Sequence, residues 1–142
     1  MNGEGWSRLG SSHEARFEAP DLFVLRIQGD VLLSDTTALF DRIEALAAQV
    51  GRQLLLLVDV SKLGQVRPDA RTSALGRDLT TSLRGLAVYG GSYHQRLYAN
   101  LLIKAIPLLR PNRPQKPMLF CATEADARAF VAELRGREAS AS

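Results

Sequence analysis

Segments typical of strands and segments typical of helices alternate along most of this chain, and that order constrains the fold more than any other feature. Residues 13–19 alternate weakly between polar and apolar side chains, and residues 22–28 alternate clearly. Pro20 and Asp21 lie between the two segments, as in a turn. We therefore expect the domain to begin with an antiparallel hairpin.

The middle of the chain predicts a helix and then a buried strand. Apolar residues recur at helical spacing over residues 34–50, with Ser34 as the expected N-cap and Gly51 as the expected end. Residues 53–60, QLLLLVDV, are apolar without alternation, which is typical of a central strand covered by helices on both faces.

The alternation continues to the end of the chain. The remaining elements that we expect are helices over residues 68–83 and 93–109, strands over 86–89 and 117–122, and a final helix after Thr123, capped through Asp126. A hairpin followed by three right-handed strand–helix–strand crossovers gives an α/β fold with a mixed five-stranded sheet and four helices, in the order ββαβαβαβα.

Length and composition indicate one domain. A chain of 142 residues that is 46% hydrophobic and 23% charged suits a single globular core. We expect the domain to span residues 13–135. Residues 1–12, rich in Gly and Ser, and residues 136–142, small and polar, are expected to be flexible tails.

The expected location is the cytoplasm. Cys121 is the single cysteine, so no intrachain disulfide can form, and no secretory signal is visible. The longest apolar run, residues 54–58, is too short to span a bilayer. A net charge of +3 predicts mild affinity for anionic partners and no specific binding of nucleic acid.

The sequence lacks a complete catalytic pattern. Residues 90–94, GGSYH, lie between a strand and a helix, but His94 stands where a nucleophile elbow has glycine. His13, the other histidine, lies far from Ser92 in the sequence. The Asp59 carboxylate is expected to accept backbone N–H groups of the following turn, with an acid–base role as the alternative. We therefore expect no enzyme activity, no cofactor and no metal site.

Four segments carry a resemblance to a known family: LFVLRIQGDVLLSDTTALFDRIEAL, LLLLVDVSKLG, LRGLAVYGGSYHQRLYANLLIK and KPMLFCATEADARAFVAEL. Together they resemble the STAS domain of bacterial anti-sigma-factor antagonists, in the sporulation-antagonist-like branch related to CRAL-TRIO proteins. The resemblance implies a small cytoplasmic regulatory module without enzyme activity that binds a protein partner, a nucleotide or an apolar ligand.

The family's phosphorylation site has no clear counterpart. Phosphorylated antagonists carry a serine at the start of the helix after the central strand, and the matching position here is near Gln65, which cannot accept a phosphate. Ser61 and Ser73 are the nearby hydroxyls and are weak candidates for phosphorylation. The alternative is that Ser61 caps a turn and Ser73 lies within a helix.

Two surfaces are candidates for binding. One is at the ends of the strands, where backbone N–H groups could bind an anion; it comprises Ser61, Gly90, Gly91 and Ser92. The other is the third helix, whose apolar stripe is wider than one sheet-facing side requires; its candidates are Leu97, Leu101, Lys104 and Leu108.

Three occupants remain open for the third helix: the domain's own core, a second copy in a homodimer, or an apolar ligand. The leading hypothesis is a non-catalytic module that binds a protein partner or itself. The alternative is a carrier or sensor of a small apolar or amphipathic ligand beneath the third helix.

Overall fold

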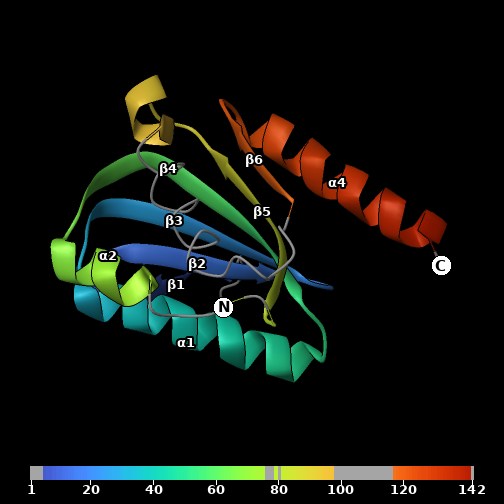
Figure 1. Ribbon diagram of the computed structural model, residues 1–142, viewed down its shortest axis with the longest axis horizontal. Helices are drawn as coiled ribbons and strands as arrows, with labels where there is room; N and C mark the ends of the chain where they lie inside the picture. The colour runs from blue at the N-terminus through green and yellow to red at the C-terminus, as the bar shows by residue number, and fades with distance from the viewer. Residues whose placement is uncertain (1–4, 76–78, 80, 98–116, 142) are drawn as a thin grey trace.

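The computed structural model describes residues 5–75, 79, 81–97 and 117–141. They form a six-stranded sheet whose strands follow one another in chain order (Figure 1). The strands are β1 (Ser7–Leu9), β2 (His13–Glu18), β3 (Leu22–Val31), β4 (Leu54–Val66), β5 (Leu83–Tyr89) and β6 (Met118–Cys121). The helices are α1 (Leu33–Val50), α2 (Pro68–Leu75) and α4 (Glu124–Ala141), and residues 93–97 are also helical.

The sheet is mixed, as the sequence predicts. β1, β2 and β3 pair in antiparallel fashion, whereas β3, β4, β5 and β6 pair in parallel. Parallel neighbours need a crossover connection, and α1 and α2 lie in the connections that flank β4. The expected count of five strands is wrong by one, because β1 adds an edge strand before the predicted hairpin.

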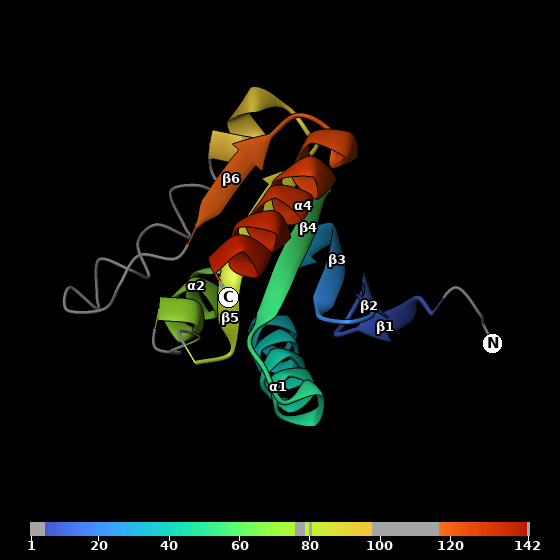
Figure 2. The same cartoon turned by 90° about the vertical axis from the view of Figure 1, so that its right-hand side faces the viewer.

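Helices cover both faces of the sheet. Figure 1 shows α1 and α2 on one face and α4 on the other, and Figure 2 shows α4 running alongside β4, β5 and β6. The core under α1 includes Phe23, Leu25, Phe40, Ile43 and Leu56. The core under α4 includes Val24, Leu57, Ala127, Val131 and Leu134.

β4 is the central strand that the apolar run predicts, and it is longer than expected. Residues 54–58 are all buried. Beyond the expected end at Val60, the strand continues to Val66 beside the end of β3. There the Gln65 N–H donates to Asp30 Oδ1 at 2.9 Å, a contact that only the folded chain brings together.

Both segments that were expected to be flexible tails contain regular structure. β1 lies within residues 1–12, and its Leu9 is buried in the core under α1. α4 continues through residues 136–141, and Glu138 on that last part accepts the Arg84 Nε–H at 2.6 Å. Tertiary contacts therefore order polar residues that local composition assigns to tails.

The start of α1 also differs from the prediction. The N-cap is Leu32, not Ser34, and the Asp35 carboxylate accepts the Leu32 N–H at 2.8 Å. Gly51 ends the helix as predicted, with φ 81° and its N–H donating to Ala47 O at 2.8 Å. Asp35 fixes the start of the helix because its carboxylate is also bonded to Ser11 and His13.

The predicted boundary between the second helix and the next strand is wrong. α2 ends at Leu75, and β5 begins at Leu83, so Arg84 and Gly85 lie in the strand. Gly85 is packed so closely that an added Cβ would lie 2.9 Å from a Leu55 methyl carbon. The expected third helix is described only over residues 93–97, and the rest of it lies outside the described residues.

Candidate functional site

A row of polar side chains crosses the sheet at the last residues of β5 and β6 and midway along β3 and β4. Glu14, Arg26, Asp59, Tyr89 and Cys121 pair in register from β2 to β6. Tyr89 and Cys121 belong to the core under α4, so the row lies on the face of the sheet that carries α4. At the ends of β5 and β6 the row reaches the carboxyl edge, where open sheets with parallel strands bind ligands.

A bulge in β4 places a second group of side chains beside this row. Arg26 pairs with Asp59 and Gln28 pairs with Lys62, so β4 has one more residue than β3 over this stretch. Asp59 and Lys62 therefore face the same side of the sheet, although they are three residues apart. A cavity of about 250 Å³ lies here, lined by Arg26, Ile27, Gln28, Asp59, Ser61 and Lys62.

Asp59 and the glycine turn after β5 fit together closely. Asp59 Oδ1 accepts the Ser61 N–H at 2.9 Å. The sequence predicts such a bond within a turn, whereas Ser61 lies within β4. Gly90 has a φ of 89°, and a Cβ on it would lie 3.0 Å from Asp59 Oδ1 and 3.2 Å from Ser61 Cβ. Burial, with a further contribution from the Asp59 charge, raises the pKa of Tyr89 to about 12, so its hydroxyl stays protonated.

Ser92 is the N-cap of the helical residues 93–97, a role that the sequence reasoning missed. Its hydroxyl accepts the Gln95 N–H at 3.2 Å, and its own N–H donates to Gln95 Oε1 at 2.7 Å. This is a capping box, and the S-x-x-Q spacing of Ser92 and Gln95 was the signal that could have revealed it. The Ser92 N–H is therefore already bonded and is not a free donor for an anion.

The other groups at this turn also bond to the local backbone. Gln95 Nε2 donates to Leu63 O at 3.2 Å, and Arg96 Nη1 donates to Gly91 O at 2.9 Å. Within the described residues no hydrogen bond joins Ser92 to His94. These bonds hold the end of β5, the start of the helix and the end of β4 together.

Apolar side chains are exposed at the same turn. Tyr93 is 68% exposed and Leu97 is 39% exposed. Of the third-helix candidates, Leu101, Lys104 and Leu108 lie outside the described residues, so the wide apolar stripe stays a prediction.

The two candidates for phosphorylation lie on different elements. Ser61 is exposed on β4, and Ser73 is half-buried on α2. The first turn of α2, residues 68–71, contains no hydroxyl side chain. Phosphorylation of either serine stays a prediction.

His13 lies in a separate buried cluster at the start of α1. Its Nε2 lies 3.1 Å from Asp35 Oδ2, and its Nδ1 accepts the Gln28 N–H at 2.9 Å. Nε2 therefore carries the proton and donates a hydrogen bond to Asp35. The Ser11 N–H also donates to Asp35 Oδ1 at 2.7 Å. Both ring nitrogens of His13 are therefore used in hydrogen bonds that link β2 to β3 and to α1.

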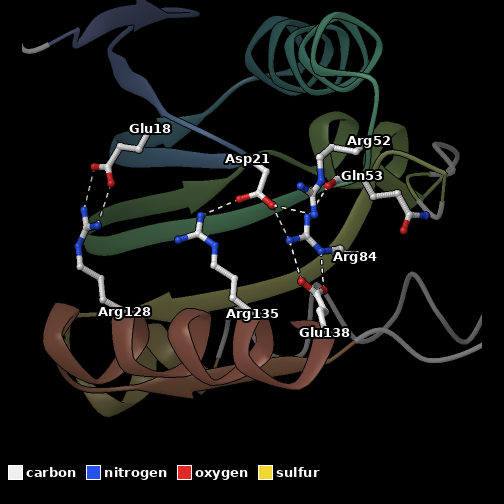
Figure 3. A network of polar contacts seen from close by, with 8 residues as sticks. All are labelled: Glu18, Asp21, Arg52, Gln53, Arg84, Arg128, Arg135 and Glu138. Atoms are coloured by element: carbon white, nitrogen blue, oxygen red, sulfur yellow. Dashed lines mark hydrogen bonds and ion pairs between the residues drawn. The ribbon is translucent and has the colours of Figure 1, made fainter. Parts of the chain in front are cut away.

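A third polar cluster fastens α4 to the sheet (Figure 3). Asp21, 1% exposed, accepts a hydrogen bond from Arg84 at 2.5 Å and one from Arg135 at 2.6 Å. Burial raises the pKa of Asp21, but the Arg135 and Arg84 hydrogen bonds outweigh it, so the pKa lies below its usual value. Arg128 on α4 likewise binds Glu18 and lowers the pKa of that carboxyl to about 2.

Comparison with solved structures finds a match over most of the chain. The match is an uncharacterized protein of the DUF3478 family from Shewanella loihica PV-4, described as having a SpoIIAA-like fold. It aligns with a TM-score of 0.60 and 15% identity, covering 89% of this chain and 93% of that one. The chain has a SpoIIAA-like, or STAS-like, fold.

Comparison with protein-family models and with curated proteins gives no match to this sequence. No helix of the described residues is long and apolar enough to cross a membrane. Within the same residues, no three potential metal-ligating side chains lie together.

Proposed function

We propose that this STAS-like domain is a non-catalytic regulatory module that binds a protein partner or a second copy of itself. We place the contact at the turn after β5, with Tyr93 and Leu97 at its centre and Ser61 nearby. The observation that carries the proposal is the exposure of Tyr93 and Leu97, at 68% and 39%, on a turn whose polar side chains bond to its own backbone.

The polar contacts of this turn favour binding over chemistry. Ser92 serves as a cap, and Gln95 and Arg96 bond to carbonyl groups of β4 and of the turn. Hydrolysis by Ser92 would need a base in contact with its hydroxyl. An ordered turn that presents a tyrosine and a leucine is instead suited to a protein contact, where aromatic side chains contribute strongly.

Replacing Leu97 tests the contact. A glutamate in an apolar interface would be buried without a partner, so we expect Leu97→Glu to weaken association and to keep the circular dichroism spectrum and melting temperature. Native mass spectrometry and sedimentation report the oligomeric state. Crosslinking in extracts of the source cells reports a different protein partner.

Phe17→Glu is the matched control. Phe17 has similar exposure, 36%, but pairs with Phe23 at the start of β3, away from the turn after β5. The Phe17→Glu substitution should leave association unchanged. Equal behaviour of the two variants would contradict the proposed surface, as would a wild-type protein that stays monomeric and uncrosslinked. A small molecule copurifying with the monomer would instead favour the carrier alternative.

The absence of enzyme activity is part of the proposal. We expect panels of esterase and phosphatase substrates to show no turnover above the uncatalysed rate. Turnover that is lost in Ser92→Ala or in His94→Ala would contradict it.

A further inference from the structure

The cavity at the β4 bulge has charges that the partner-binding proposal does not use. Two cationic side chains, Arg26 and Lys62, and one carboxylate, Asp59, line it, together with the polar side chains of Gln28 and Ser61. The bulge itself puts Asp59 and Lys62 on one side of the sheet. The lining therefore has a formal net charge of +1 and carries both signs.

Arg26 is held in place and yet has bonding capacity left. Its guanidinium carbon lies 3.8 Å from the centroid of the Trp6 ring, a cation–π contact that orients the planar group. Its Nη1 lies 3.4 Å from Glu14 Oε1, which is a long hydrogen bond, and the side chain is 43% exposed. A guanidinium has five N–H donors, so most of them remain for a ligand.

The other two charged groups also have free capacity. Among the residues that the structure describes, the Lys62 ammonium has no ion pair. Asp59 is in register with Arg26, but the ion pair that Arg26 forms is with Glu14. Asp59 Oδ1 accepts the Ser61 N–H, which fixes the carboxylate at the edge of the cavity.

We propose that this cavity binds a small amino-acid-like molecule. Its carboxylate lies between Arg26 and Lys62, and its ammonium group faces Asp59. Arginine matches the planar geometry of a carboxylate, and lysine adds a point charge beside it. Gln28 and Ser61 offer further hydrogen bonds.

Charge and size favour this class over simpler ions. A dicarboxylate without an amine would face the Asp59 charge, and a polyamine would face Arg26 and Lys62. The cavity of about 250 Å³ is below the usual range for drug-sized ligands, about 300–1,000 Å³, so it suits a small metabolite. L-Glutamate, a zwitterion with one extra carboxylate and hence a net charge opposite to that of the lining, is the matching probe.

The full chain provides its own reporter for binding. Trp6 is the single tryptophan, and it contacts Arg26. We expect L-glutamate to change its fluorescence saturably at or below about 1 mM, with calorimetry giving the same affinity. Glutarate, which lacks the amine, and putrescine, which lacks the carboxylates, should bind at least about tenfold more weakly.

Variants assign the contacts. Lys62→Gln, at an exposed position, should weaken L-glutamate binding about tenfold, and Asp59→Asn should weaken L-glutamate while strengthening glutarate. Arg71→Gln on α2 removes the same charge away from the cavity and should change nothing. Thermal melting of each variant confirms that it is folded.

Three results would overturn the inference: no saturable signal with L-glutamate, glutarate bound as tightly as L-glutamate, or an unchanged affinity in Lys62→Gln. The inference is independent of partner binding, because Lys62→Gln leaves Tyr93 and Leu97 unchanged. Association and L-glutamate binding can therefore fail separately.

Discussion

Asp35 joins the start of α1 to the segment around the beginning of β2 through one buried carboxylate. It accepts hydrogen bonds from Ser11 before β2, from His13 on β2 and from the Leu32 N–H at the start of α1. Burial raises its pKa, but the hydrogen bonds from Leu32 and Ser11 outweigh burial, so the pKa lies below the usual value of 3.8.

We expect Asp35→Asn to lower the free energy of unfolding by about 3 kcal/mol at neutral pH, because the amide presents donors to groups that themselves donate. Because the pKa of Asp35 is depressed in the folded protein, the carboxylate contributes fully to the unfolding free energy above pH 3.8. That contribution is lost as the pH falls below 3.8. Urea unfolding of both proteins between neutral and acid pH measures the difference.

Asp69→Asn is the matched control, because Asp69 is an exposed carboxylate in the first turn of α2. Its substitution should change stability by no more than about 0.5 kcal/mol. If the two variants unfold alike, the Asp35 cluster does not stabilise the fold as described.

At the scale of elements, α4 is joined to the sheet by packing and by ion pairs. Ala127, Val131 and Leu134 supply the apolar contact. Arg128 and Arg135 reach back to carboxylates at the two ends of the β2–β3 turn (Figure 3). The Arg135 contact is the more strongly desolvated of the two, because its partner Asp21 is almost completely buried.

Two arginines on α4 allow a direct comparison. Arg135→Gln leaves the buried Asp21 with one fewer partner, so we expect a loss of about 2 kcal/mol in unfolding free energy. Arg137→Gln removes the same charge from a pair with Glu133 in which both side chains are well exposed, so the loss should be no more than about 0.5 kcal/mol. Equal losses in chemical denaturation would show that the Asp21 contact adds nothing.

The contact between Glu18 and Arg128 should make the attachment of α4 sensitive to acid. The pKa of Glu18 falls from 4.5 to about 2 in the folded protein, so its stabilisation is complete above pH 4.5 and is lost as the pH falls toward 2. The destabilisation of Glu18→Gln relative to the wild type should therefore shrink over that window. Denaturation at a series of pH values measures it, and a difference that stays constant with pH would contradict the contact.

At the scale of the whole molecule, both ends of the described chain belong to the folded unit. β1 pairs with β2, and Leu9 enters the core under α1 with 2% exposure. At the other end, Glu138 on α4 binds Arg84 on β5. The folded unit is thus larger than residues 13–135.

Leu9→Ala tests this directly. Removing a buried leucine side chain should cost about 2–4 kcal/mol if β1 is part of the core. Leu33→Ala on α1 removes the same atoms from a side chain that is 43% exposed, and should cost less than about 1 kcal/mol. Thermal and urea unfolding give both values. A Leu9→Ala protein as stable as the wild type would mean that the first segment is a tail after all.

The sequence by itself determined those helices and strands whose hydrophobic pattern and end residues lie within one short stretch of chain. The apolar run of residues 54–58 is the buried central strand, and Gly51 ends α1 with the left-handed backbone predicted for it. The final helix buries Ala127, Val131 and Leu134, with Thr123 Oγ1 accepting the Asp126 N–H at 3.2 Å. Hydrophobic period and capping residues are local properties, so a single sequence carries them.

Only the tertiary structure decided the features that depend on pairing across long stretches of chain. The cavity at Asp59 and Lys62 exists because β4 gains a residue against β3, and no local pattern encodes that register. β1 and the end of α4 are ordered by partners distant in sequence, such as Arg84 for Glu138. The start of α1 was also decided by a contact distant in sequence. Asp35 is bonded to His13 and sets the N-cap at Leu32, whereas local preference favoured Ser34.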